Sequence, residues 1–253
     1  MENVMARMIP TLALAFSLIA TSASALTLTL PPPLANGRPA LPRIAAPAPP
    51  GAARINAALT KEDASWRAFI KECHDQAGAD FDLERSNQVA MAGPAYFALT
   101  IGYSYDCGGA HPDGGTIALV YDLNTGAPAN WARLLPKALI DSTSTDSAGD
   151  GTTIGLIASK TLQKIYAREA LAHGDADFKT NCADVVSQDG LTFQVWPDAK
   201  ADGLMLVPDL PHVVLACGDP QVVSVQALKN LGVGAALLSA IDAAHAAAPN
   251  TTH

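Results

Sequence analysis

Four cysteines in a chain with a predicted export signal constrain the fold more than any other feature. Cysteines outside the cytoplasm usually form disulfide bonds, and an even number permits complete pairing. Four cysteines allow three pairings, of which we expect the one that joins neighbours in sequence. That arrangement gives the bonds Cys73–Cys107 and Cys182–Cys217. Because no Cys-x-x-Cys spacing occurs, a redox motif or a zinc ribbon has little support.

The first 25 residues predict a secretory signal peptide. An apolar run from Met8 to Ala20 follows Arg7, and it is short for a membrane span. Residues 23–25, Ala-Ser-Ala, supply the small side chains of a cleavage site, so we expect the cut after Ala25. After cleavage the sequence predicts no membrane span, and we expect a periplasmic or secreted protein.

Proline dominates the stretch that follows the predicted cleavage site. Residues 26–50 hold eight prolines, which neither a helix interior nor a central strand accommodates. We therefore expect residues 26–51 to be an extended linker with polyproline II character. The pattern changes at Ala52, and we predict a single folded domain over residues 52–248.

Hydrophobic periodicity in this domain predicts an α+β fold, in which an antiparallel sheet packs against helices. Helical spacing begins after Ala52 and ends at Gly78, and Cys73 lies on the apolar stripe. Alternation predicts strands at residues 84–93, 95–106, 116–123, 191–196 and 212–218, and residues 221–228 predict a strand that ends in a helix. We expect a polar loop at residues 141–153 and helices at residues 131–139, 154–173, 175–187 and 231–248.

The charge of the chain bears on its partners. The net charge is -8 and the pI is near 5.1, which argues against nucleic acid, because phosphate contacts need basic patches. An acidic surface suits a basic partner, which it attracts over a distance.

The sequence lacks the usual signatures of catalysis. It contains no H-E-x-x-H, no phosphate-binding loop and no dinucleotide fingerprint. His111 is the best single candidate, since Asp106 and Asp113 lie close to it in sequence. Catalysis also needs a cavity and a positioned partner, and a metal needs three or four ligands. We therefore expect no catalytic residue, no metal and no cofactor, and we interpret His111 as the anchor of a tight loop.

Tyrosines on the flanking strands favour binding instead. Tyr103, Tyr105 and Tyr121 lie on either side of the loop, and tyrosine is common at binding surfaces. Half-buried packing within a sheet explains any one of them equally well. Gly108 and Gly109 permit a sharp change of direction. We expect a strand–loop–strand unit, held by a disulfide bond, that shapes a binding surface together with His111.

The same stretch carries a resemblance to a known family. "YSYDCGGAHPDGGTIALVYDLNTG" and the following "LLP" resemble the extracytoplasmic domain of RsiV-type anti-sigma factors, which sense lysozyme. The shared pattern is a tyrosine-bearing strand, Gly-Gly-Ala-His-Pro at residues 108–112, a second strand and a turn that ends at Gly126. The resemblance covers about residues 52–230. It implies a small α+β domain that binds proteins or cell-wall material, here as a stand-alone exported member of the family.

Three functions remain open from the sequence. The first is an exported binding or sensing module for an extracytoplasmic protein or a peptidoglycan-related ligand, with a lysozyme-like protein as one candidate. The second is a secreted hydrolase that uses His111 with Asp106 or Asp113. The third is a structural protein of the envelope. A hydrolase requires His111 to line a deep pocket with a carboxylate in reach, whereas a binding loop does not.

Overall fold

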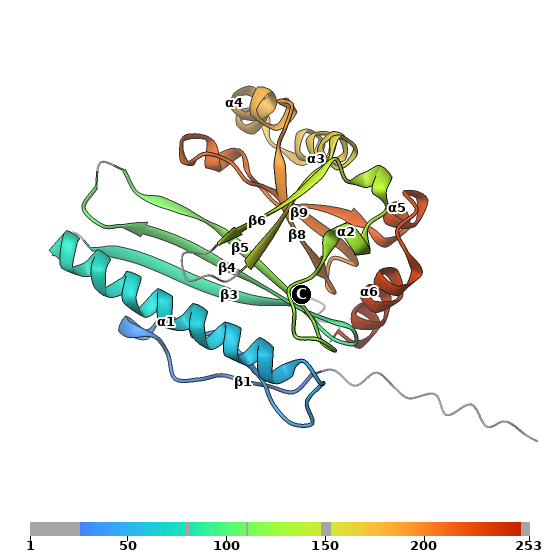
Figure 1. Cartoon of the computed structure of the whole chain (residues 1–253). Coiled ribbons are helices and arrows are strands. Elements are labelled where there is room, and N and C mark those ends of the chain that lie inside the picture. Colours follow the sequence, from blue (N-terminus) through green and yellow to red (C-terminus); the bar gives the residue numbers. More distant parts are fainter. Residues whose placement is uncertain (1–25, 79–80, 110, 148–152, 249–253) are drawn as a thin grey trace, which may run out of the picture.

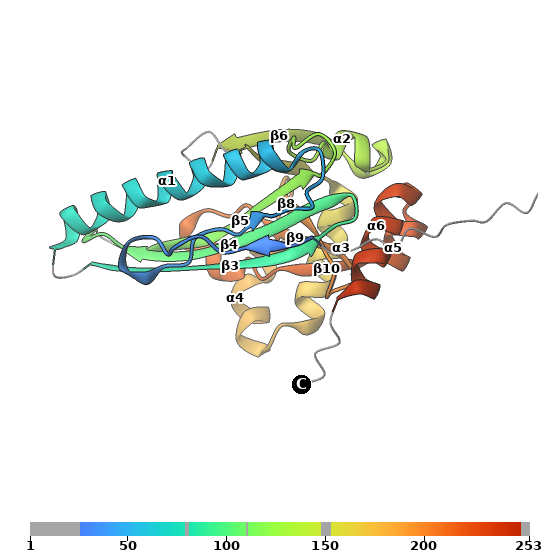
Figure 2. The same cartoon turned by 90° about the horizontal axis from the view of Figure 1, so that it is seen from below.

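The predicted α+β architecture, with antiparallel sheets and two disulfide bonds, is confirmed. The computed structural model describes residues 26–78, 81–109, 111–147 and 153–248, so the predicted signal peptide lies outside the described residues. Two antiparallel sheets carry most of the helices on their outer faces (Figure 1). Figure 2 shows α1 and α4 on opposite sides of the molecule, with the strands between them.

The first sheet consists of three long strands in the order β3 (Asp82–Ala92), β4 (Tyr96–Asp106) and β5 (Asp113–Asp122). The helix α1 (Ala52–Ala77) runs along one face of this sheet (Figure 1). Alternation along β4 directs Phe97, Leu99 and Ile101 towards that helix, and all three are fully buried. The turn between β3 and β4 contains Gly93, whose positive φ of 97° suits glycine.

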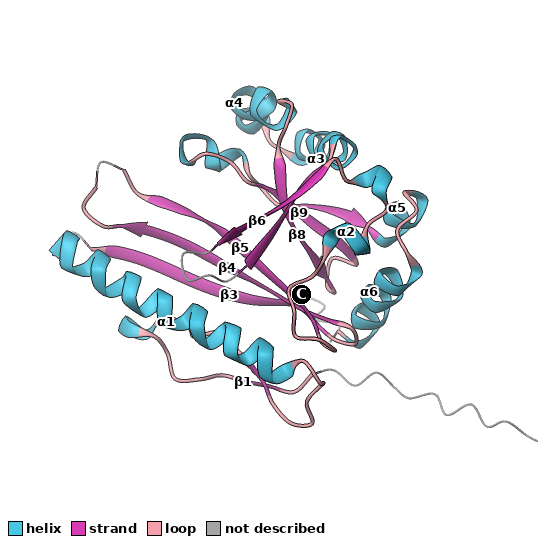
Figure 3. Ribbon diagram, viewed as in Figure 1, coloured by secondary structure: helices cyan, strands magenta, loops and turns pink. Residues whose placement is uncertain are grey.

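The second sheet has the order β10-β9-β8-β7-β6. Its strands are β6 (Ser142–Ser147), β7 (Thr153–Ala158), β8 (Thr192–Asp198), β9 (Gly203–Pro208) and β10 (Gln221–Ser224). The helices that accompany this sheet are α2 (Trp131–Leu134), α3 (Lys160–His173), α4 (Ala176–Ser187), α5 (Val225–Asn230) and α6 (Ala235–Ala247), with short 3-10 turns at η3 (Lys137–Leu139) and η4 (His212–Cys217). Figure 3 distinguishes these helices from the strands and loops.

A glutamine side chain connects the two sheets. Gln194 on β8 donates from its amide nitrogen to the carbonyl of Thr116 at 2.9 Å, and its oxygen accepts from the backbone N–H of Ala118 at 2.8 Å. Both partners belong to β5, so the side chain replaces the backbone of a neighbouring strand at this edge. The sheets are thereby fixed in register beside one another.

The segment predicted as a linker packs on the domain instead of extending away from it. Its short strands β1 (Leu28–Thr29) and β2 (Arg43–Ile44) pair with each other, and η1 (Ala35–Gly37) lies between them. Leu41 and Ile44 are buried in the same hydrophobic cluster as α1. The sequence does not predict this packing, because the few apolar residues between the prolines follow no regular period.

Buried charges fix this segment to α1 and β3. Both carboxylate oxygens of Asp63, which is 1% exposed, accept from the backbone N–H of Leu41 at 3.2 Å. The same carboxylate contacts Arg43 at 2.8 Å and Arg85 at 3.4 Å. Arg85 also donates to the carbonyl of Pro39. The network joins three parts of the chain that are far apart in sequence.

Three local predictions are wrong. Residues 142–147 and 153–158 form the hairpin strands β6 and β7, where we predicted a loop and the start of a helix. The helix α3 begins only at Lys160, because the Ser159 hydroxyl accepts from the N–H of Leu162 and caps it. Residues 212–217 form the turn η4 and not a strand, and Val213 is 86% exposed. Val214 and Leu215 pack against the core and Cys217 is buried, so the apolar run at η4 reflects the contacts of a turn and not the alternation of a strand.

Both predicted disulfide bonds are confirmed. Cys73 joins Cys107 with a Cα separation of 4.7 Å, and Cys182 joins Cys217 with a Cα separation of 5.3 Å. The second bond fixes η4 to α4. Within the described residues, no helix is both long enough and apolar enough to cross a membrane.

Candidate functional site

A cleft of about 510 Å³ opens between α1, the two sheets and the segment after β9. Four aromatic side chains line it, and we call it the aromatic groove: Trp66, Phe69, Tyr103 and Tyr105. The remaining lining residues are Ser65, Ala68, Glu72, Thr116, Ile117, Asp146, Ile154, Gln194 and Asp209.

Helix and strand periodicity bring the four aromatic rings together. Trp66 and Phe69 are three residues apart on α1, and Tyr103 and Tyr105 are two apart on β4, so each pair shares a face. The two tyrosine rings are stacked, with centroids 6.2 Å apart and an interplanar angle of 12°. The ring centroids of Trp66 and Tyr103 are 5.4 Å apart, and those of Phe69 and Tyr105 are 4.9 Å apart. The rings therefore form one continuous surface across helix and sheet.

A glycine on the next strand makes room for one of these rings. Gly115 on β5 lies opposite Tyr103 in the strand register. A Cβ atom at Gly115 would lie 3.0 Å from the Tyr103 hydroxyl oxygen and 3.2 Å from the ring carbon that bears it. The glycine thus allows the tyrosine to lie flat over β5. We interpret the glycine at position 115 as a requirement of this packing.

A carboxylate and an imidazole lie beside the groove. Asp113, at the start of β5, accepts from the Tyr105 hydroxyl at 3.0 Å and from the N–H of Gly114 at 2.7 Å. Its Oδ1 atom also lies 2.9 Å from Nδ1 of His212 on η4. These contacts connect the aromatic groove to η4, which the bond Cys182–Cys217 holds in turn.

The environment changes the acidity of both partners in the Tyr105–Asp113 hydrogen bond. Burial, the hydrogen bond to Asp113 and the negative charge of that residue raise the pKa of Tyr105 to about 12. Burial by itself would raise the pKa of Asp113. The hydrogen bonds from Gly114, Tyr105 and His212 outweigh that effect and lower the pKa below its usual value. Tyr105 is therefore the neutral donor and Asp113 the ionised acceptor at neutral pH.

Burial and nearby carboxylates also raise the pKa values of two further groups in the groove. Burial, followed by the charges of Asp113, Asp209 and Asp146, raises the pKa of Tyr103. Burial and the charge of Asp146 raise the pKa of Asp209. Both shifts show that the aromatic groove disfavours additional negative charge.

The pH dependence of Tyr105 tests this geometry. We expect Asp113→Asn to lower the pKa of Tyr105 part of the way from about 12 towards the usual value near 10, because burial remains the largest cause. The raised pKa stabilises the fold below about pH 10, and the contribution is lost as the pH rises towards 12. Titration of ¹³Cζ-labelled tyrosine by NMR measures the pKa, and Tyr105→Phe identifies the signal. An unchanged Tyr105 titration in Asp113→Asn would contradict the assigned hydrogen bond.

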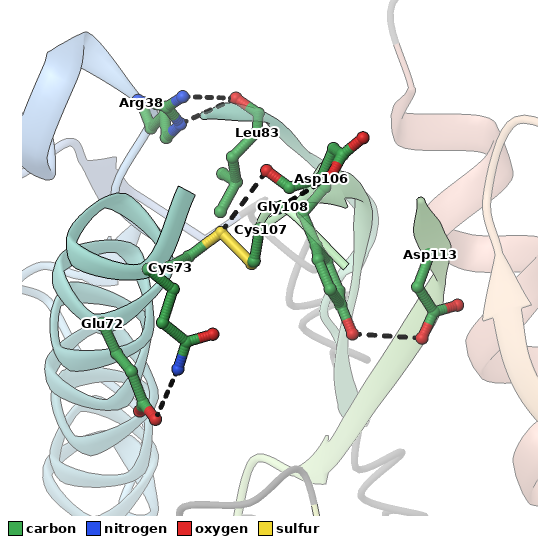
Figure 4. The surroundings of a disulfide bond; sticks show 10 residues. Arg38, Glu72, Cys73, Leu83, Asp106, Cys107, Gly108 and Asp113 are labelled. Carbon is green, nitrogen blue, oxygen red and sulfur yellow. Dashed lines mark hydrogen bonds between the residues drawn. A yellow bond between two sulfur atoms is a disulfide. The ribbon is translucent and has the colours of Figure 1, made fainter. Parts of the chain in front are cut away.

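The bond Cys73–Cys107 holds one end of the groove. It connects the last turn of α1, one turn beyond Phe69, to the residue after β4 (Figure 4). The loop that follows turns at Gly108, whose φ is 76° and whose N–H donates to the Asp106 carboxylate at 2.9 Å. A Cβ at that glycine would lie 3.2 Å from the Cα of Ala77. The disulfide and the glycine together keep the hairpin against the helix.

The structure separates the predicted site residues into two groups. Tyr103 and Tyr105 lie in the aromatic groove. Tyr121 lies in the core at 2% exposure, so its prediction as a binding-surface residue is corrected, since it is on the face of β5 that packs beneath α1. Gly108 and Gly109 are exposed in the hairpin loop, and their role in binding stays a prediction.

His111 is also exposed, and none of the side-chain hydrogen bonds that we predicted to anchor the loop is found within the described residues. Within residues 26–78, 81–109, 111–147 and 153–248, no hydrogen bond or ion pair of its side chain is found. The loop is held by Cys107 and Asp106 instead. The imidazole that contacts Asp113 belongs to His212. Among the described residues, no group of three or more His, Cys, Asp or Glu side chains is arranged to hold a metal ion.

Sequence reasoning missed several residues of the groove. Trp66 and Phe69 belong to the helical periodicity that ends at Gly78, which by itself indicates only core packing. The predicted bond from Cys73 to Cys107 is the signal that places this helix near the tyrosines. Asp209 and His212 gave no signal, because their positions depend on how β9 and η4 fold back towards β5.

Comparisons with known proteins leave the family open. No family model matches the sequence, and no curated protein matches it. A solved structure of a DUF3298 family protein from Pseudomonas aeruginosa is similar, with 14% identity, a TM-score of 0.43 and coverage of 66% of this chain and 71% of that chain. A member of the DUF3298 family from Bacteroides fragilis has 13% identity and a TM-score of 0.43, with coverage of 74% and 73%.

Proposed function

We propose that this chain is an exported binding module that holds an extracytoplasmic protein or a cell-wall ligand in the aromatic groove, without catalysing a reaction. The observation that carries the proposal is the groove itself. Its rings come from two elements and are braced by a disulfide bond at one end. Aromatic rings in a preformed cleft supply contact area at low entropic cost, which is typical of binding sites.

Two further observations support the proposal. Two disulfide bonds are typical of proteins outside the cytoplasm, in agreement with the predicted signal peptide. The resemblance of residues 103–126 to RsiV-type domains favours a protein or cell-wall ligand, and a lysozyme-like protein is one candidate on that resemblance alone.

A binding experiment with a substituted tyrosine tests the proposal. We expect the immobilised protein to capture either purified peptidoglycan fragments or lysozyme, and we expect Tyr103→Ala to weaken this binding about tenfold or more, as for a central aromatic contact. Tyr103→Phe should retain the binding, because its ring keeps the contact with Trp66. Surface plasmon resonance gives the affinities, and circular dichroism verifies that each variant is folded.

A matched control separates the groove from the rest of the surface. Leu30 is 79% exposed and does not line the groove, so Leu30→Ala should bind as the wild type does. Equal affinities of the wild type and Tyr103→Ala would contradict the assignment of the groove. Turnover of the bound ligand that is lost in His111→Ala or His212→Ala would favour the alternative, a secreted hydrolase that uses Asp113.

A further inference from the structure

The charged side chains that line the aromatic groove are all acidic. Glu72 comes from α1, Asp146 from β6 and Asp209 from the segment after β9, and the described lining contains no lysine or arginine. Asp113 adds a further carboxylate next to Tyr105, with His212 as its partner. The cleft therefore combines aromatic walls with a negative potential.

Two of the neutral polar side chains of the groove are engaged within the protein. Both hydrogen-bonding atoms of the Gln194 amide bind β5, and the Tyr105 hydroxyl donates to Asp113. Glu72 accepts from the Gln76 amide at 3.3 Å, and its carboxylate oxygens retain further acceptor sites for a ligand. Such oxygens accept best from charged donors, namely ammonium and guanidinium groups.

The aromatic walls favour the same kind of ligand. A cation is attracted to the face of an aromatic ring, most strongly where the ring is partly shielded from water. The protein already contains such a contact, because the guanidinium carbon of Arg85 lies 5.2 Å from the centre of the Trp66 ring. Phe69, Tyr103 and Tyr105 are half-buried and line the open part of the cleft.

We propose that the aromatic groove binds a lysine or arginine side chain presented by a basic segment of a protein partner. This inference rests on the proposed binding function and names the chemistry of the ligand. Charge complementarity selects a cationic segment over a neutral glycan, and the net charge of -8 adds long-range attraction for such a partner. The volume of about 510 Å³ accommodates a long basic side chain with its flanking residues.

Calorimetric titration with a capped hexa-arginine peptide tests the inference. We expect Glu72→Gln combined with Asp209→Asn to weaken peptide binding about three- to tenfold at low salt, the range for losing two exposed charge contacts. Binding by the wild type should also weaken as salt rises. The control combines Asp184→Asn with Asp242→Asn, which removes two exposed carboxylates from α4 and α6 and changes the net charge equally. That control should bind as the wild type does.

The outcomes separate the inference from the proposed function. Equal weakening in the groove variant and the control would show only general charge attraction and would overturn the inference. Binding of neutral chitohexaose that is lost in Tyr103→Ala, without binding of hexa-arginine, would also overturn it but would retain the groove as a binding site. If the protein binds none of hexa-arginine, chitohexaose, peptidoglycan fragments and lysozyme, the result would contradict both the inference and the proposed function.

Discussion

We expect Asp63→Ala to lower the free energy of unfolding by about 3–5 kcal/mol, the usual cost of removing one partner from a buried charge pair. The side chain of Arg85 is 0% exposed and would lose its nearest counter-charge. Burial already lowers the pKa of Arg85, and the charge of Asp63 opposes that shift. The backbone N–H of Leu41 would lose its acceptor as well. Urea denaturation at neutral pH measures the change.

Two variants control for this prediction. Asp63→Asn keeps an oxygen that can accept from the N–H of Leu41, so its loss should be smaller than that of Asp63→Ala. Asp75→Ala removes an exposed carboxylate on the same helix, paired with Lys71, and should change the stability little. A loss in Asp63→Ala no greater than that in Asp75→Ala would contradict the role of the network.

Removal of the disulfide Cys73–Cys107 should have an effect of similar size. The two cysteines are 34 residues apart, and the chain-entropy account gives a loss of about 4 kcal/mol in the free energy of unfolding for a loop of that length. Because Cys73 follows Phe69 by one helical turn, the variant with alanine at both positions should also bind the groove ligand more weakly. Urea denaturation and the affinity measurement test the two effects separately.

The second disulfide provides the comparison. Cys182 and Cys217 are 35 residues apart, so alanine at both positions should lower the stability by about the same amount. Neither cysteine lines the groove, and ligand affinity should fall less than in the first variant. A stability loss below about 1 kcal/mol in the Cys73 and Cys107 variant would contradict a bracing role for this bond.

Local pattern was sufficient for part of this fold. The long strands on either side of Gly93 and the turn at Gly126 follow from residues close together in sequence. The disulfide pairing follows from joining cysteines that are neighbours in their order along the chain, although 34 and 35 residues separate them. Gly126 has a φ of 67°, and the backbone of Gly51 lies against it. Such features depend on alternation and on backbone conformations that glycine permits.

Long-range contacts decided what the sequence could not predict. The strand β6 is polar and exposed along its described length, so nothing in its pattern distinguishes it from a loop until it pairs with β7. Residues 38–44 pack on the domain through Asp63 and Asn56, which are contacts between distant parts of the chain. Asp209 and His212 could not be predicted as site residues either, because only long-range contacts bring them to the groove.

Site-specific photocrosslinking tests the central claim, ligand binding in the aromatic groove, most directly. Ala68 is exposed and lines the groove, so a photoreactive amino acid placed there should form a covalent adduct with the bound ligand in envelope preparations. The same amino acid at Asp184 on α4, which is exposed but outside the groove, should form none. We predict an adduct from position 68 that disappears when Tyr103→Ala is added. Equal adducts from both positions, or an adduct only from position 184, would contradict the account.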